Sequence, residues 1–105
     1  MPYQTELLLD AKATLGEKGF AAVASGITQH AVYINWSAGV TAGKVIVEEF
    51  FEATQPGTPA LIREVSWTTA DSEDVVHCGY AIKHIQARIS QDISNGTVSV
   101  NYLGV

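Results

Sequence analysis

Two runs of alternating residues near the C-terminus, separated by an Asn-Gly pair, constrain the fold of this chain more than any other feature. The first run places Lys83, Ile85, Ala87 and Ile89 in one phase and Ile82, His84, Gln86, Arg88 and Ser90 in the other. The second places Val98, Val100 and Tyr102 opposite Thr97, Ser99, Asn101 and Leu103. A period of two indicates half-buried strands, and Asn95-Gly96 is a strong turn signal because both residues tolerate positive φ. We therefore expect an antiparallel hairpin whose loop, residues 91–96, is longer than a minimal turn.

Similar short runs fill the rest of the chain, bounded by Gly, Pro and acidic turn signals. They predict strands at 20–25, 27–36, 44–52, 60–69 and 75–79, while residues 5–13 fit either a strand or a short helix. The expected core phase of these strands holds Val32, Ile34, Trp36, Val45, Val47, Leu61, Val65 and Trp67. About eight short strands predict an all-β protein, a single antiparallel β-sandwich. A jelly roll is favoured over an immunoglobulin-like sandwich, and the Cys…Trp…Cys spacing of antibody domains is absent.

Chain length, net charge and cysteine count limit the number of domains and the kinds of partner that this chain can have. The 105 residues suit one domain, 1–105, with residues 1–13 a candidate arm that orders on a neighbour. A net charge of −5 with scattered Lys and Arg argues against a nucleic-acid partner. No apolar run reaches the ~20 residues of a membrane helix, so no membrane partner is expected. The one cysteine, Cys78, excludes an intrachain disulfide and is expected to be a small core residue.

Residue types that often carry catalysis are present, but their spacing is not that of a catalytic site. His30, His77 and His84 fall on different predicted strands and are expected to be half-exposed, with a three-histidine metal site as the alternative. Cys78 cannot be activated by His77, because adjacent strand residues point to opposite faces. The acidic segment 71–74 is read as a solvated turn, with calcium binding as the alternative. We expect no enzyme activity and no cofactor.

The strand at 44–52 carries apolar and acidic side chains in both phases. Val45, Val47, Glu49 and Phe51 alternate with Lys44, Ile46, Glu48, Phe50 and Glu52. One phase must therefore place an aliphatic and an aromatic side chain outside the core. This is either ordinary surface apolarity or a surface that a partner covers. Ile46, Glu48 and Phe50 are the candidate protein-interface residues.

Four segments carry a resemblance to a known class of proteins. They are Gly43-Lys44-Val45-Ile46-Val47-Glu48-Glu49, a strand that ends at Trp67, Ile82-Lys83-His84-Ile85-Gln86-Ala87-Arg88-Ile89-Ser90, and the final Gly96-Thr97-Val98-Ser99-Val100-Asn101-Tyr102-Leu103-Gly104 strand. This order resembles small structural proteins of tailed bacteriophages, which have strands of the types G-x-V-x-V-E, I-x-A-R-I-S and G-T-V-x-V. The likeness covers about the last two thirds of the chain and is a pattern of strands.

The resemblance implies a capsid cement (decoration) protein of the virion, made in the host bacterial cytoplasm. Such a protein binds the outside of the phage head and bridges subunits of the major capsid protein. It implies a homo-oligomer, dimer or trimer, in which Ile46 and Phe50 would make contacts. The alternatives are a head–tail connector, tail or fibre module, and a carbohydrate-binding module in which Tyr33, Tyr80 or Tyr102 stacks on sugar rings.

Overall fold

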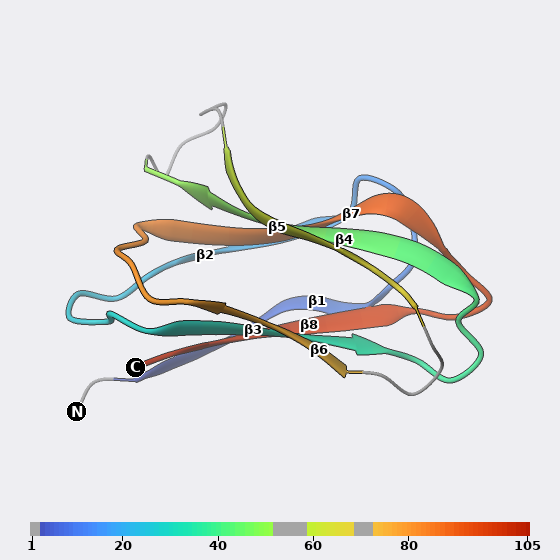
Figure 1. Ribbon diagram of the computed structural model, residues 1–105, viewed down its shortest axis with the longest axis horizontal. Helices are drawn as coiled ribbons and strands as arrows, with labels where there is room; N and C mark the ends of the chain where they lie inside the picture. The colour runs from blue at the N-terminus through green and yellow to red at the C-terminus, as the bar shows by residue number, and fades with distance from the viewer. Residues whose placement is uncertain (1–2, 52–58, 69–72) are drawn as a thin grey trace.

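The computed structural model describes residues 3–51, 59–68 and 73–105, and within these ranges it contains strands and no helix. The strands are β1 (Gln4–Lys12), β2 (Lys18–Ala22), β3 (His30–Trp36), β4 (Ala42–Phe50), β5 (Ala60–Ser66), β6 (Glu73–Cys78), β7 (His84–Ser94) and β8 (Val98–Gly104). They form two four-stranded antiparallel sheets, which lie one over the other as a sandwich (Figure 1). The predicted all-β sandwich of about eight strands is confirmed.

The strand order is nested. The first sheet has the order β1-β8-β3-β6 and the second has β2-β7-β4-β5. The first strand therefore pairs with the last, the second with the seventh, the third with the sixth and the fourth with the fifth. Two sheets of four strands in this nested order favour the jelly roll over the seven- or nine-stranded immunoglobulin arrangements. The choice between the two topologies stays a prediction.

The expected closing hairpin is wrong, because β7 and β8 belong to different sheets. β7 pairs with β2 and β4, whereas β8 pairs with β1 and β3. The turn residue is as predicted, since Asn95 has a φ of 62°. The residues before it do not form a loop, because β7 continues through Ser94. Alternation indicates the buried face of each strand but carries no information on which strand it pairs with.

Two connections between the sheets run side by side and are joined by hydrogen bonds. The β3–β4 connection contacts the β7–β8 turn through Ser37 N, which donates to Thr97 O at 2.9 Å, and Thr41 N, which donates to Ser94 O at 3.0 Å. The Asn95 side-chain amide also donates to Thr41 Oγ1 at 2.8 Å. These bonds satisfy backbone groups at the point where both segments leave one sheet for the other.

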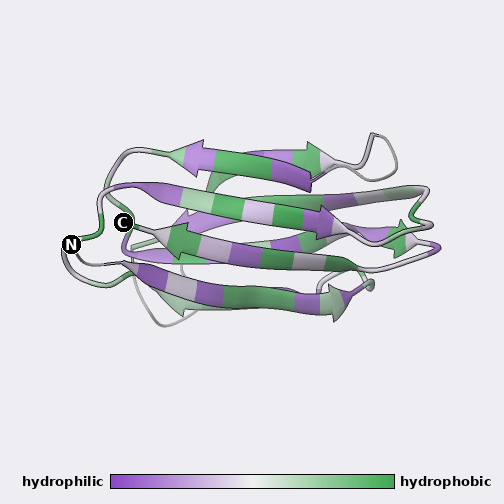
Figure 2. Ribbon diagram, turned by 90° about the horizontal axis from the view of Figure 1, so that it is seen from below, coloured by the Kyte–Doolittle hydropathy of each residue, from purple (hydrophilic) through white to green (hydrophobic). Residues whose placement is uncertain are grey.

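The core lies between the sheets and is made largely by the predicted phases of the strands. Figure 2, which looks onto the outer side of the first sheet, shows hydrophobic and hydrophilic residues alternating along the strands. The fully buried side chains with the largest volumes are Tyr102, Ile34, Ile85, Ile89, Val32, Val45, Val47, Val98 and Val100. Cys78 is buried in the core, as expected. Trp67 is half-buried and packs against the core. Leu61 was expected in the core but is 64% exposed on the edge strand β5, so this prediction is wrong.

The N-terminal segment forms an edge strand of the first sheet. β1 pairs with β8 through a bulge that leaves Leu8 between the paired residues Leu7 and Leu9. The bulge lets Leu8 and Leu9 both enter the core, where they are 6% and 2% exposed. The helix alternative for residues 5–13 is therefore wrong. The pairing of β1 with β8 gives no support to the expectation that residues 1–13 are an arm that orders on a neighbour. Whether a neighbour contacts this segment stays untested.

Candidate functional site

The outer face of the second sheet carries the candidate interface residues. Seven of its outward side chains, which we call the Glu48 face, are Phe20 from β2, Ile46, Glu48 and Phe50 from β4, and His84, Gln86 and Arg88 from β7; Lys18 and Glu64 flank this set opposite Arg88 and Ile46. The strand registers place these side chains in rows across the sheet. Gln86 lies opposite both Phe20 and Glu48, and His84 lies opposite Phe50. The rows bring residues from three strands into one continuous surface.

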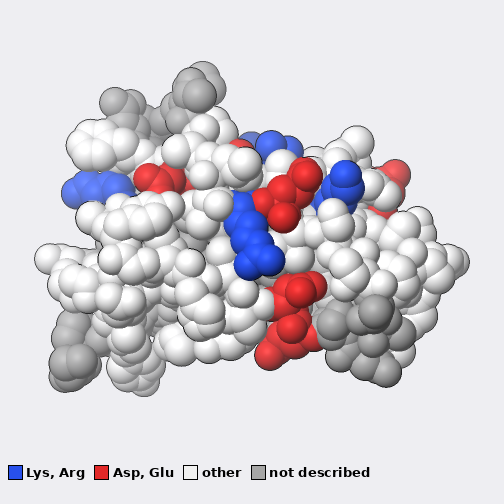
Figure 3. Space-filling view, in the orientation of Figure 1, with Lys and Arg blue, Asp and Glu red and all other residues white. Residues whose placement is uncertain are grey.

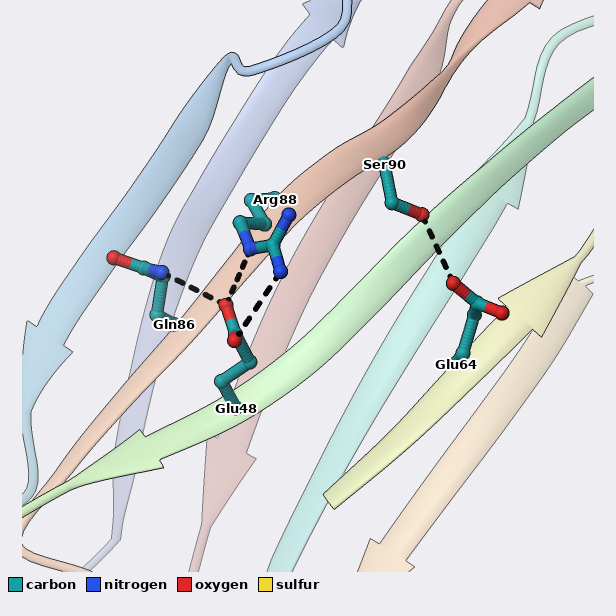
Figure 4. Close-up of polar contacts among 5 residues, drawn as sticks. All are labelled: Glu48, Glu64, Gln86, Arg88 and Ser90. Carbon is teal, nitrogen blue, oxygen red and sulfur yellow. Dashed lines mark hydrogen bonds and ion pairs between the residues drawn. The ribbon is translucent and has the colours of Figure 1, made fainter. Parts of the chain in front are cut away.

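Glu48 is the centre of a hydrogen-bonded group on this face (Figure 4). Its Oε1 accepts a bond from Arg88 Nε at 2.7 Å and one from Gln86 Nε2 at 3.0 Å. A longer contact of 3.5 Å joins Arg88 Nη2 to Glu48 Oε2. The Glu48 side chain is only 4% exposed, whereas that of Arg88 is 36% exposed. A buried carboxylate is tolerated here because a guanidinium and an amide both donate to it.

An aromatic group lies beside this ion pair. The rings of Phe20 and His84 are stacked with centroids 5.3 Å apart, and Phe20 meets Phe50 edge-on at 5.9 Å. Phe20 remains 41% exposed, whereas Phe50 and His84 are buried. His84 Nδ1 has no hydrogen-bond partner in the described part of the chain. Phe20 is therefore the aromatic ring that this group presents outward.

Charges around the Glu48 face are of mixed sign. Toward the β5 edge, Ser90 Oγ donates to Glu64 Oε2 at 3.3 Å (Figure 4). Figure 3 looks onto the neighbouring edge of the sandwich, where β5 and β6 lie, and positive and negative side chains are interspersed there within a largely uncharged surface. Among the described residues on that side, no extended field of one sign is seen. This arrangement suits a protein surface better than a polyanion.

The three predicted interface residues do share one outer face, but they differ in exposure. Ile46 is half-buried, whereas Glu48 and Phe50 are covered by their own neighbours. Of the three, only Ile46 offers appreciable area to a partner. Whether they contact another protein stays a prediction. Sequence reasoning missed Phe20, because nothing in the residues of β2 indicates that it pairs with β7 and so lies beside Gln86.

The histidines were expected to be half-exposed, and this is wrong for His30 and His84, which are buried; His77 is exposed. His30 Nε2 lies 3.0 Å from the backbone oxygen of Tyr80, so Nε2 carries the proton and donates. Nδ1 must then accept from the Tyr102 hydroxyl, 2.7 Å away. Burial raises the pKa of Tyr102 to about 12, which keeps that hydroxyl a donor.

Because burial lowers the pKa of His30 below 6.5, we expect the protein to lose stability on acidification. Below pH 6.5 the unfolded chain binds a proton at this residue that the folded protein resists, so the free energy of unfolding falls as the pH falls. Urea unfolding at about pH 7.5 and at about pH 5.5 measures this loss. The His30→Gln variant should lose less stability over the same interval. An equal loss in the variant would assign the pH dependence to other groups.

Neither metal-binding alternative, the three-histidine site or the calcium site, finds a candidate group of ligands among the described residues. Within 3–51, 59–68 and 73–105, no three His, Cys, Asp or Glu side chains are grouped closely enough to hold a metal ion. Asp71 and Ser72 of the acidic segment considered for calcium lie outside the described residues, whereas Glu73 and Asp74 begin β6, so the expected turn is wrong for these two residues. Asp74 accepts a hydrogen bond from Trp36 Nε1 at 2.8 Å.

The tyrosines considered for sugar stacking lie in different surroundings. Tyr102 is buried in the core at 1% exposure, so it is unavailable to a sugar ring and its assignment is wrong. Tyr33 is half-buried on the outer side of the first sheet, and Tyr80 is exposed after β6. A carbohydrate-binding site therefore stays a prediction, and of the three tyrosines only Tyr33 or Tyr80 could stack on a sugar ring.

Comparisons with known proteins do not place the chain in a family. No family model matches it, and no curated protein or solved structure matches it at a significant level. Over the described residues, the structure contains no helix that is long and apolar enough to cross a membrane.

Proposed function

We propose that this chain is a non-enzymatic structural protein that docks on another protein through its Glu48 face. The setting we propose is the outside of a phage head, where it would act as a capsid cement protein between major capsid protein subunits. The observation that carries the docking surface is the fixed position of the Glu48, Gln86 and Arg88 side chains. The phage setting rests on the resemblance of the strand sequences, and a head–tail connector, tail or fibre module is the alternative setting.

The Glu48 face meets two requirements of a docking surface. Its long polar side chains are already held by one another, so little side-chain freedom remains to be lost when a partner binds. Its outward residues include Phe20 and Arg88, and aromatic residues and arginine are enriched at protein interfaces. Because Arg88 is paired with Glu48, docking on a neutral protein surface would not leave an isolated buried charge.

The proposal predicts stoichiometric uptake by capsid shells assembled without this protein, measured by co-sedimentation. Ile46→Asp should weaken uptake by about tenfold or more, because it places a third carboxylate beside Glu48 and Glu64 in the face. Leu15→Asp is the matched control. Leu15 is 58% exposed in the β1–β2 connection, and its substitution should leave uptake unchanged.

Two outcomes would contradict the proposal. Shells that take up none of the wild-type chain would remove the capsid setting. Uptake that is equally insensitive to Ile46→Asp and Leu15→Asp would show that a surface other than the Glu48 face makes the contact.

A further inference from the structure

The Asn95-Gly96 pair that predicted the turn is also a place where the chain can modify itself. An asparagine side chain is attacked most readily by the backbone nitrogen of the next residue when that residue is glycine, because glycine has no side chain to hinder the approach. The other two asparagines of the chain, Asn35 and Asn101, are followed by bulky aromatic residues. Asn95 is exposed, so the water that completes the reaction has access to it.

The reaction is deamidation, and it needs only the chain and water. The Gly96 nitrogen bonds to Cγ of Asn95, and the side-chain nitrogen leaves as ammonia with the proton of the Gly96 amide. Water then opens the resulting cyclic imide at one of its carbonyls. Opening at Cγ leaves aspartate in a normal peptide bond. Opening at the backbone carbonyl leaves Gly96 joined to the side chain as isoaspartate, which adds a carbon atom to the backbone.

The folded protein holds Asn95 in a conformation that opposes the first step. Its φ of 62° places it in the left-handed region. At the ψ of that region, about +47°, the Gly96 nitrogen and the Asn95 Cβ lie on opposite sides of the Cα–C bond. The cyclic imide requires both atoms on the same side of this bond. The ring can therefore close only after the backbone of the turn has rotated.

The contacts of the turn prevent that rotation. The Asn95 amide donates to Thr41 Oγ1 at 2.8 Å, and Thr97 N donates to Ser37 Oγ at 2.8 Å. Thr41 and Ser37 both belong to the β3–β4 connection, which lies at the same end of the sandwich as the β7–β8 turn (Figure 1). The backbone is thus fixed on both sides of Gly96.

We propose that Asn95 is a deamidation site that the folded protein protects, so that modification marks chains whose β7–β8 turn has separated from the β3–β4 connection. Separation breaks the bonds to Thr41 and Ser37 and frees the backbone to close the ring. Because a folded chain spends little time in such an open state, it is modified far more slowly than an unfolded chain. The site lies outside the Glu48 face, so this inference goes beyond the proposed function and does not depend on it.

The two products have different consequences for the turn. Aspartate leaves the backbone unchanged, tolerates the left-handed conformation and can accept a hydrogen bond from the Thr41 hydroxyl. Isoaspartate lengthens the backbone at Gly96, which is already closely packed. A Cβ added to Gly96 would lie 2.5 Å from Ser37 Oγ and 2.7 Å from Val40 Cγ2. Chains that carry isoaspartate should therefore fail to restore the contact, which makes their unfolding hard to reverse.

Incubation of the wild-type chain in mildly alkaline buffer, with and without urea above the unfolding midpoint, tests the site. Trypsin cuts after Arg88, so one peptide, 89–105, contains both Asn95 and Asn101. Mass spectrometry of this peptide follows the conversion of each amide to an acid, with Asn101 as the internal control. In urea, Asn95 should be modified faster than Asn101. We expect Asn95 to be modified at least about tenfold more slowly without urea, because the folded chain must first open.

Thr41→Val tests whether the contact provides the protection. The variant keeps the shape of the side chain but removes the acceptor of the Asn95 amide. Modification of the folded variant should be faster than that of the folded wild type, with the rate in urea unchanged. Thr28→Val is the matched control, at an exposed threonine in the β2–β3 connection, and it should change neither rate.

Three results would overturn the proposal. Modification of Asn95 no faster than that of Asn101 in urea would remove the site. Equal rates for Asn95 with and without urea would remove the protection by the fold. A folded Thr41→Val variant that is modified no faster than the wild type would separate the protection from the β3–β4 connection.

Removal of the urea tests the consequence for refolding. Size-exclusion chromatography separates refolded from unfolded chains, and isoaspartate at position 95 should be enriched in the unfolded fraction. Asn95→Asp should refold as the wild type does, because its backbone has the normal length. An equal share of isoaspartate in both fractions would show that modification does not mark unfolded chains. Failure of Asn95→Asp to refold would assign the effect to the lost amide and not to the longer backbone.

Discussion

Replacing Arg88 with methionine is expected to lower the free energy of unfolding by about 3 kcal/mol. The substitution removes the guanidinium from Glu48, whose side chain is only 4% exposed, and leaves Gln86 as the remaining donor to that carboxylate. A buried charge without its partner is among the most destabilising changes in a folded protein. Urea unfolding monitored by tryptophan fluorescence would measure the loss.

The matched control is the double variant Glu48→Met/Arg88→Met. Replacing both members of a buried ion pair with apolar side chains is often nearly neutral, so the double variant should recover most of the stability. The coupling energy of the double-mutant cycle then isolates the ion pair from the packing of the two side chains. Additive losses from the two single variants would mean that Glu48 and Arg88 do not depend on one another.

Gly19→Ala is expected to cost about 3 kcal/mol, at the upper end of the range for overpacked sites. A Cβ at this position would lie 1.5 Å from the backbone oxygen of Leu8. Leu8 is at the bulge of β1, and Gly19 is in β2, so these edge strands of opposite sheets approach one another closely. The obstacle is backbone and cannot rotate away. Chemical denaturation would measure the change in unfolding free energy.

Gly16→Ala separates this steric effect from the loss of glycine itself. Gly16 has a φ of 92°, but a Cβ there would meet nothing within 4 Å. Its substitution should cost only about 1 kcal/mol, from the unfavourable backbone conformation. A Gly19→Ala variant as stable as Gly16→Ala would show that β1 and β2 can separate without loss.

The fold class and most of the core could be predicted from alternation. Ile85, Ala87 and Ile89 on β7, like Val98 and Val100 on β8, are buried in the predicted phase. Pairing could not be predicted, because a half-buried strand shows the same pattern beside any neighbour. The hairpin expected around Asn95 failed for this reason. The turn chemistry was correct, but the turn moves the chain from one sheet to the other.

The candidate site could be predicted only in part. Alternation placed Ile46, Glu48 and Phe50 together outside the core, and they do share an outer face. It could not reveal that Glu48 is buried, because an acid in an outward phase is normally solvated. The burial depends on Arg88 and its neighbours on β7, which become adjacent only through the β4–β7 pairing. A search for antiparallel runs that match an acid with a base would have found this signal.

The nested strand order also governs when the chain can fold. β8 lies between β1 and β3, and β7 lies between β2 and β4, so the last two strands to be synthesised complete the interior of both sheets. Until they leave the ribosome, β1 and β3 have no common neighbour, and neither do β2 and β4. Their apolar sides stay exposed to solvent until β7 and β8 have emerged, and pairing then closes long loops, which slows folding. The sandwich should therefore form only after both of these strands have left the ribosome, and a nascent chain that stops before Val98 should remain a target for chaperones and proteases.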